Sequence, residues 1–424
     1  MKTFTYTLNS QNIDSIIDFS LFRNEKNILI QIFCGEKKEI LENIINLLGK
    51  KLPQAVCIGS STDGEINNEN ITTLKTIITI SIFYKTTLEA TYIQGNDSFK
   101  NGQKLASTLC KDDTQLIITF TDSKKTNGEE FLNGISSINN KVVISGGMAG
   151  DNANFTQTFI SYQNKILTHG AVGVALNSKT LKVCNAYNFN WSAIGIEHII
   201  EEAKANRVYK ISGLTPLDFY KKYLGDYVAK ALPATGIEFP LIVQKNGIPL
   251  ARAVIAKHKD GSLTFAGNLH KGDIVKLGFG NVELIMNNPL KSLFHKYNIE
   301  DTETFFIYTC MARRRYMPDL IDIEIKPFSK IAPTAGFFTY GEFYHHNGKN
   351  ELLNQTLTIL ALSEKDDVNY EAPSIIHDEN TKLSDHAKSL QALTHLIQQS
   401  SSDYNKQSKE LENGNIYAQN LIAS

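Results

Sequence analysis

The sequence predicts a mixed α/β protein built from a repeated unit, and two observations support this prediction. The spacing G-x-x-T-x-G-E occurs twice, beginning at Gly59 and at Gly336. Each copy lies at nearly the same distance after an apolar strand that ends in cysteine, Cys34 in one and Cys310 in the other. A fainter third copy ends in the turn S-G-G-M-A-G-D at 145–151. We interpret the unit as strand, helix, strand, glycine-rich turn and strand.

The first half of the chain alternates between strand and helix patterns. Apolar residues recur at helical spacing within 36–51, and clean alternation over 75–84 indicates a strand with one buried face. Fully apolar runs such as 116–121 indicate buried strands. The expected elements are strand 27–34, helix 36–51, strands 54–60, 75–84 and 87–94, helix 99–110, strand 116–121, helix 128–137, strand 142–144 and four short strands within 155–189.

The pattern loosens over 190–213, and we place a domain boundary there. The predicted domains are 1–200 and 212–363, interlocked, each with sheets covered by helices. Pro216 stands at the preferred first turn of a helix over 217–224. The remaining expected elements are strands around Leu241, 252–256 and 263–266, a helix over 286–297, and the strand 304–310 that precedes the second G-x-x-T-x-G-E copy.

A separate C-terminal segment, 375–424, is predicted to form a signalling-type helix over about 381–413. Apolar residues stand at an unbroken interval of seven, which favours a coiled coil over an ordinary surface helix. These residues form one seam of the coiled coil. The second seam, three residues further along in each heptad, is mostly polar, so the coiled coil is expected to be weak. The seam residues are Leu383, Leu390, Ile397, Tyr404 and Leu411, and the second positions are His386, Leu393, Ser400, Gln407 and Gly414.

Composition excludes several classes of protein. The chain has 424 residues, with 42% hydrophobic and 21% charged residues, as expected for an ordinary globular protein. The net charge of −1 gives no electrostatic reason to expect nucleic acid or an anionic membrane as a partner. The start lacks a signal-peptide pattern, and no apolar run is long enough to span a bilayer. A cytoplasmic location is therefore expected.

Several motifs together resemble the FIST family of bacterial sensory proteins, over about 27–364. The resemblance implies a FIST N-terminal domain, a FIST C-terminal domain and binding of a small ligand. The motifs are GSSTDGEI at 59–66, SGGMAGDN at 145–152, GAVGVAL at 170–176, W-x-x-x-G at 191–195, GLTPLDFYKKYLG at 213–225, DGSLTFAGNLHKGD at 260–273, C-x-x-R at 310–313, GFFTYGEF at 336–343 and NQTLTILAL at 354–362.

This resemblance implies a cytoplasmic sensor for an amino acid or related metabolite, without enzymatic activity. Members often have proline after the tryptophan, whereas Ser192 follows Trp191 here, so the local turn is expected to differ. The family usually feeds an output such as a kinase, a cyclase or a chemoreceptor. We expect a separate output partner and a homodimer through the C-terminal helix. The turn at 145–151 lacks the residues of a P-loop or a dinucleotide fold, which argues against catalysis.

The glycine turns supply the candidate ligand-binding residues. Glycines let the backbone approach a ligand, and an acid beside them can receive an ammonium group. Each acid taken singly fits a turn cap better than a ligand site, and only their recurrence at corresponding positions of the repeat favours a shared cleft. The candidates are Ser61, Thr62, Asp63, Glu65, Asp151, Asn152, Arg313, Thr339, Tyr340 and Glu342.

Three arginines, Arg313, Arg314 and Arg315, follow the buried strand 304–310. A guanidinium group can hold a carboxylate by two hydrogen bonds. Arg313 is our candidate for this role, and Arg315 is expected to be an ordinary solvated charge. The site is thus predicted to bind a zwitterion in a cleft between the domains.

Haem binding is the alternative, because some FIST members are described as haem-binding nitric oxide sensors. The candidate haem ligands are His198, His345 and His346. Adjacent histidines on a strand point to opposite faces, so the pair is weak support for a shared ion. No cofactor is therefore expected.

Overall fold

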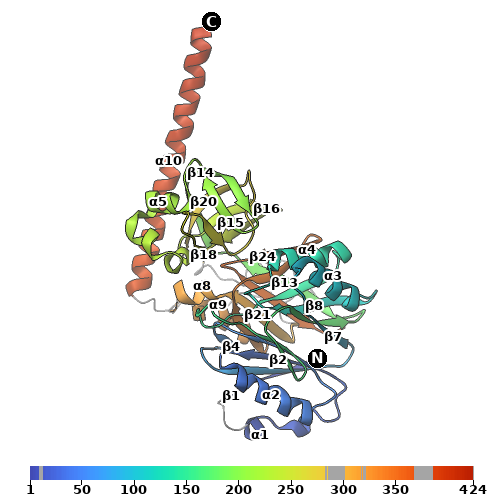
Figure 1. Cartoon of the computed structure of the whole chain (residues 1–424). Helices are drawn as coiled ribbons and strands as arrows, with labels where there is room; N and C mark the ends of the chain where they lie inside the picture. Colours follow the sequence, from blue (N-terminus) through green and yellow to red (C-terminus); the bar gives the residue numbers. More distant parts are fainter. Residues whose placement is uncertain are drawn as a thin grey trace.

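A computed structural model describes residues 1–8, 13–281, 284, 301–316, 318, 321–366 and 385–423. Figure 1 shows stacked sheets at one end, a second unit beside them, and a long C-terminal helix. The helix expected over 286–297 lies outside the described residues, as does Leu383.

The predicted unit occurs three times, and the mixed α/β fold class is confirmed. The first copy comprises β2 (Asn27–Cys34), α2 (Lys38–Lys51), β3 (Val56–Ser61), β4 (Glu65–Asn67), β5 (Asn70–Thr72) and β6 (Thr76–Phe83). The second comprises β8 (Thr114–Thr121), α4 (Gly128–Ile138), β9 (Val143–Met148), β10 (Ile160–Tyr162), β11 (Lys165–Leu167) and β12 (Ala171–Asn177). The third comprises β21 (Thr304–Cys310), α8 (Met311–Tyr316), α9 (Ile321–Ser329), β22 (Thr334–Thr339), β23 (Glu342–His346), β24 (Lys349–Leu353) and β25 (Leu357–Ser363).

The three copies exchange hairpins in a cycle. The β4-β5 hairpin pairs with β22 of the third copy, β23-β24 pairs with β9 of the second, and β10-β11 pairs with β3 of the first. Each copy therefore completes the sheet of another copy, and the first and last parts of the chain cannot separate without breaking a sheet. The predicted interlocking is confirmed in this form.

Each exchanged sheet has six strands in equivalent order. The outer strand of each is β1 (Lys2–Leu8), β7 (Thr87–Ile93) or β13 (Lys182–Asn188). The orders are β1-β6-β2-β3-β10-β11 for sheet 1, β7-β12-β8-β9-β23-β24 for sheet 2 and β13-β25-β21-β22-β4-β5 for sheet 3. Short helices α1 (Ile13–Ile16) and η1 (Phe19–Leu21) follow β1. None of β1, α1 and η1 was expected from the sequence.

The core between the sheets is aromatic. Phe33 of β2 stacks on Phe337 of β22, with ring centroids 5.2 Å apart. Phe120 of β8 packs edge-on against Phe337 and against Tyr308 of β21. These four side chains are buried and come from all three copies. Because every copy contributes, this core forms only when the three sheets come together.

Helices cover the outer faces of sheets 1 and 2. In α2 the buried residues Leu41, Ile44, Ile45 and Leu48 recur at helical spacing and pack on sheet 1. Helix α3 (Ser98–Leu109) packs against α4 over sheet 2. The two helices approach closely at glycine, since a Cβ on Gly102 would lie 2.0 Å from Phe131 O.

A seven-stranded sheet, with α5, is inserted between β13 and β21; we call residues 191–280 the insertion. No helix or strand was expected within 190–213, but this stretch contains a long strand and its partner. Residues 200 and 212, the predicted domain limits, both fall within the insertion. Its elements are β14 (Trp191–Lys204), β15 (Arg207–Ile211), α5 (Pro216–Ala231), η2 (Ala234–Ile237), β16 (Leu241–Lys245), β17 (Ile248–Arg252), β18 (Val254–Lys257), β19 (Leu263–Phe265) and β20 (Ile274–Gly280).

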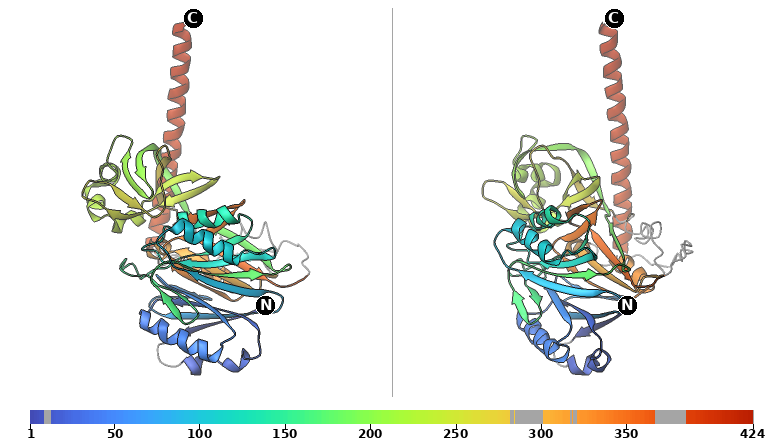
Figure 2. Two further views of the ribbon diagram at one scale, coloured as in Figure 1. Left: turned by 45° about the vertical axis from the view of Figure 1, so that its right-hand side comes forward. Right: turned by 90° about the vertical axis from the view of Figure 1, so that its right-hand side faces the viewer.

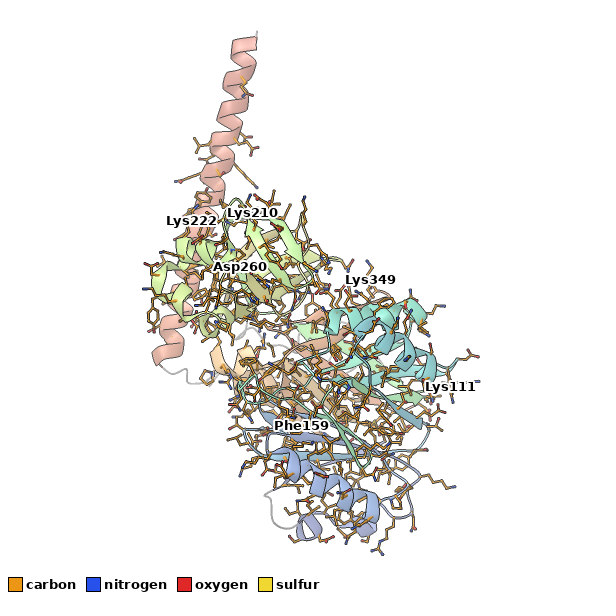
Figure 3. All side chains as sticks on the ribbon, in the orientation of Figure 1. Lys111, Phe159, Lys210, Lys222, Asp260 and Lys349 are labelled. Carbon is orange, nitrogen blue, oxygen red and sulfur yellow. The ribbon has the colours of Figure 1, made fainter. Side chains whose placement is uncertain are left out.

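Buried charges attach the insertion to α4 and β24. Arg252 is fully buried and donates to Glu129 Oε2 at 3.4 Å and to Leu352 O at 3.2 Å. Lys245 forms a second ion pair with Glu129, and Arg252 and Lys245 hold the pKa of this carboxyl below its usual range despite burial. Lys349, labelled in Figure 3, bonds Asn246 across the same junction. The insertion is therefore a packed part of the molecule.

The C-terminal helix, α10 (Asp385–Ala423), packs beside β14 and then extends beyond the insertion (Figure 2). The side chain of Leu390 lies outside the described residues. Ile397 is half-buried, whereas Tyr404 and Leu411 are 52% and 69% exposed. Leu393, from the second seam, is also exposed. The outer part of the predicted seam is thus uncovered within this chain.

Candidate functional site

The three glycine turns lie together at the carboxyl ends of β3, β9 and β22, where they form a ring. Ligands of open α/β sheets bind at this end of parallel strands. Each turn donates a backbone hydrogen bond to the next, at 2.9 to 3.1 Å: Asp63 N to Phe338 O, Gly150 N to Ser61 O, and Tyr340 N to Met148 O.

The repeated T-x-G-E spacing closes two of these turns. Thr62 Oγ1 donates to Glu65 Oε1 at 2.6 Å, and Thr339 Oγ1 donates to Glu342 Oε1 at the same distance. All four residues are buried. Burial raises the pKa of Glu65 to about 7 and raises that of Glu342 well above its usual value. The two pairs therefore cap their turns internally.

The raised pKa of Glu65 makes stability depend on pH. A carboxyl whose folded pKa lies above its unfolded value holds its proton more tightly when folded, so stability falls as pH rises from about 4.5 to about 7. Each pH unit in this window costs on the order of 1 kcal/mol. We expect Glu65→Gln to remove this contribution from the pH dependence of urea unfolding. A variant with the same pH slope as the native chain would contradict the assignment.

The second copy departs from this plan. Glu65 and Glu342 are the first residues of their hairpin strands, β4 and β23, but the first residue of β10 is Ile160. Asp151 precedes an extra loop that ends at Ile160. Asp151 therefore does not correspond to Glu65 and Glu342 in the repeat, because the second copy has this loop.

Tyr340 connects the extra loop to the other two turns. Its hydroxyl accepts from Asp151 N at 3.1 Å and from Ala153 N at 2.9 Å, and it donates to Asp151 Oδ1 at 2.5 Å. Asp63 Oδ2 lies 3.4 Å from the same oxygen. Burial and the Asp151 carboxylate raise the pKa of Tyr340, so it remains a neutral donor. One hydroxyl thus joins residues of all three copies.

Two arginines of α8 complete what we call the Tyr340 cluster: Asp63, Asp151, Arg314, Arg315 and Tyr340. Asp63 is fully buried, and Arg314 Nη2 donates to its Oδ1 at 2.6 Å. Arg315 donates more weakly, with Nε 3.3 Å from Oδ1, and remains 37% exposed. Burial raises the pKa of Asp63, and both guanidinium groups oppose this shift.

Arg313 lies elsewhere. Its fully buried guanidinium group binds Glu324 through two nitrogens and Gln355 O at 3.0 Å. Asn190 also donates to Glu324, and Trp191 Nε1 donates to Gln355 O, each at 2.9 Å. Arg313 therefore links α8 and α9 to the start of the insertion, and Arg314 and Arg315 are the arginines beside the turn acids.

The other candidate residues form hydrogen bonds that hold the turns in place. Ser61 Oγ accepts from Phe159 N at 3.0 Å, and Asn152 donates to Gly35 O at 3.2 Å. The structure thus brings Asp63, Asp151 and Tyr340 together, with Asn152 in the adjoining loop. Arg314, Arg315 and Phe155 were missed as site residues. The run of three arginines after a buried strand was the available signal for two of them.

The candidate haem ligands lie in different sheets. His198 of β14 packs against Phe219 and Tyr223, and burial lowers its pKa. His345 Nδ1 lies 2.8 Å from Asn350 Oδ1, and His346 Nε2 lies 3.0 Å from Asn347. Among the described residues, no group of His, Cys, Asp or Glu is arranged to hold a metal ion. Haem binding stays the alternative hypothesis.

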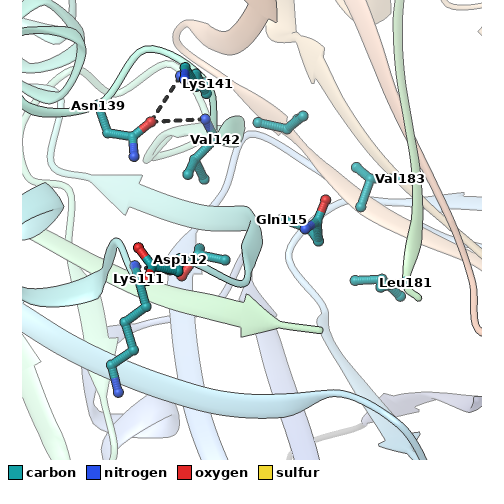
Figure 4. Close-up of a pocket in the computed structure, with 10 residues that line it drawn as sticks. Lys111, Asp112, Gln115, Asn139, Lys141, Val142, Leu181 and Val183 are labelled. Carbon is teal, nitrogen blue, oxygen red and sulfur yellow. Dashed lines mark hydrogen bonds between the residues drawn. The ribbon is translucent and has the colours of Figure 1, made fainter. Parts of the chain in front are cut away.

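A depression of about 670 Å³ lies away from these residues, where β8, β9 and β13 begin (Figure 4). Lys111, Asp112, Lys141 and Leu181 are among its lining residues. Asn139 at its edge accepts from the backbone of Lys141 and Val142. None of the predicted ligand residues lines this depression, so a substitution there can serve as a control in ligand-binding experiments.

The fold is that of an interlocked α/β protein with one polar cluster shared by all its repeats. Two family models match it: the FIST N domain over residues 28–214 and the FIST C domain over 216–345. FIST domains are sensor domains of signal transduction. The chain belongs to the FIST family. No curated protein matches it significantly. None of the helices within the described ranges has the length and apolar character needed to cross a bilayer.

Proposed function

We propose that this protein is a cytoplasmic sensor that binds an amino acid or a related small metabolite at the Tyr340 cluster. The observation that supports this is the Tyr340 hydroxyl, which connects Asp63 and Asp151 beside two guanidinium groups. Guanidinium groups bind the carboxylate that an amino acid carries by charge-assisted hydrogen bonds. The cluster joins residues 63 and 151 to residues 314, 315 and 340, so a ligand there contacts both parts of the chain.

A thermal-shift screen of amino acids and related acids tests this function. A compound that binds only the folded state raises the melting temperature with concentration. We expect Tyr340→Phe to weaken binding of any such compound about tenfold, because the hydroxyl that holds the Asp151 loop beside the arginines is lost. Lys141→Gln at the depression is the control and should leave the shift unchanged. If Lys141→Gln abolishes the thermal shift and Tyr340→Phe keeps it, the ligand binds at the depression and not at the cluster. If no compound raises the melting temperature, the proposal is wrong.

A route from the cluster to α10 supports signal output through that helix. Arg314 and Arg315 share the short helix α8 with Tyr316, whose ring lies 5.3 Å from that of Trp191. Trp191 begins β14, and β14 packs beside α10. A ligand biases α10 only through its different affinity for two arrangements of these elements. The output partner that we propose is a kinase, a cyclase or a chemoreceptor.

We further propose that α10 pairs with α10 of a second copy through its exposed apolar residues. Leu393, Tyr404 and Leu411 lie on one side of the helix and are uncovered within the chain. A largely isolated helix gains most of its stability by packing such a face. The period of seven favours an identical helix as the partner.

Light scattering on the full chain checks this pairing. Leu393→Glu with Leu411→Glu should convert a dimer to a monomer, because four like charges would face each other at the seam. Lys409→Glu changes a charge on another side of the helix and should leave the mass unchanged. An equal number of chains per particle for the native chain and for a chain ending at Glu364 would rule out dimerisation through α10.

A further inference from the structure

The acids of the Tyr340 cluster are largely occupied by the protein itself. Both oxygens of Asp151 are used: Oδ1 accepts from Tyr340 and from Phe155 N at 2.9 Å, and Oδ2 accepts from Thr156 N at 2.7 Å and Gln157 N at 3.0 Å. A carboxylate offers about four acceptor positions. Asp151 therefore holds the extra loop in place and has little capacity left for a ligand ammonium group.

The arginines of the cluster have donors to spare. Arg314 uses Nε and Nη2, and Arg315 binds Asp63 only at 3.2 to 3.4 Å. Within the described part of the chain, neither Nη1 has a hydrogen-bond partner. Two guanidinium groups also face the single Asp63 carboxylate. The unused hydrogen-bonding capacity of the arginines therefore favours an anion.

An aromatic surface lies beside these donors. Phe155 stacks on Tyr340, with ring centroids 5.0 Å apart, yet remains 44% exposed. It stands in the loop that the other two copies lack. Asn152, Ala153 and Phe155 all have positive φ, at 54°, 56° and 51°. Such conformations are costly in residues other than glycine and persist where the surrounding structure holds them, often at ligand sites.

We infer that the cluster recognises a carboxylate ligand that carries an aromatic or flat apolar group, and that the amine of an amino acid is dispensable. The Nη1 atom of Arg315, together with that of Arg314, receives the carboxylate. The exposed side of Phe155 covers the apolar group. This inference rests on the proposed function, because it names the chemistry of the ligand at the same site.

Calorimetric titration of the full chain with three matched probes tests this inference: L-phenylalanine, 3-phenylpropionate and phenethylamine. We expect the two carboxylates to bind with affinities within about threefold of each other, and the amine to bind at least tenfold more weakly. Arg315→Gln should weaken both carboxylates by about 10- to 100-fold, as expected for loss of a charge-assisted pair. Arg315→Lys should restore only part of the lost affinity for the carboxylates, because lysine cannot form two parallel hydrogen bonds to a carboxylate.

Phe155→Ala should weaken the phenyl probes but leave acetate binding unchanged. Arg315 and Phe155 are partly exposed, so the unliganded variants should melt close to the native chain. Tighter binding of phenethylamine than of 3-phenylpropionate would overturn the inference. The inference would also be overturned if none of the three probes bound. If another amino acid still bound in that case, and Tyr340→Phe weakened its binding, the proposed function would still stand.

Discussion

Replacing Arg313 by alanine is expected to lower the free energy of unfolding by about 3–5 kcal/mol. Arg313 is fully buried, and its guanidinium group binds Glu324 and the Gln355 carbonyl. Alanine leaves Glu324, which is 1% exposed, as a buried carboxylate without its counter-charge. The cost is therefore mainly that of an uncompensated buried charge. Urea unfolding followed by tryptophan fluorescence measures it, since Trp191 bonds the same Gln355 carbonyl.

The neighbouring Arg315→Ala is the matched control. Its side chain is 37% exposed and its bonds to Asp63 are long, so its removal should cost about 1 kcal/mol or less. The double variant Arg313→Met with Glu324→Leu removes both charges and should regain much of the lost stability. Equal losses for Arg313→Ala and Arg315→Ala would show that burial of the first pair is not what matters.

The sequence does not show which of the three neighbouring arginines is the buried one. The run Arg313, Arg314, Arg315 predicts a guanidinium group near the turn acids, and two of the three lie there. Which of them turns inward depends on the phase of α8, where each residue rotates by about 100°. Three identical side chains in a row contain no information about that phase. Only packing against Glu324 and Gln355 decides it.

The repeat was readable because its chemistry is local. Thr62 bonds Glu65 within one turn, and Thr339 bonds Glu342 likewise, so spacing alone shows the motif. The hairpin exchange was not readable, because β4 pairs with β22, which lies far away in the sequence. Any exposed strand edge of suitable length could accept that hairpin. The pairing is selected by the shared aromatic core.

The loosened pattern over 190–213, where strands were not recognised, has a physical cause as well. Strand β14 changes register between Ile194 and His198, and Gly195 there has a φ of 78°. A bulge shifts side chains to the opposite face and breaks the alternation by which strands are recognised. The second copy is fainter in the sequence for a similar reason, because its extra loop separates Asp151 from β10.

Replacing Gly146 by alanine is expected to cost about 2–6 kcal/mol, from two separate causes. Its φ is 127°, a conformation that costs other residues about 1–3 kcal/mol. A Cβ there would also lie 2.0 Å from Thr119 O, on the neighbouring strand β8. That oxygen belongs to a buried ladder and cannot move aside, which adds about 1–3 kcal/mol of overpacking.

Gly247→Ala separates these two causes, because Gly247 has a φ of 82° but nothing within 4 Å of an added Cβ. It should cost only about 1 kcal/mol. Denaturant midpoints of both variants and the native chain give the comparison. If the two substitutions cost the same, close approach to β8 is not why glycine stands at 146. The larger loss expected for Gly146→Ala would show that this glycine is required for packing β9 against β8, and that the G-G-M-A-G-D turn needs no bound phosphate to account for it.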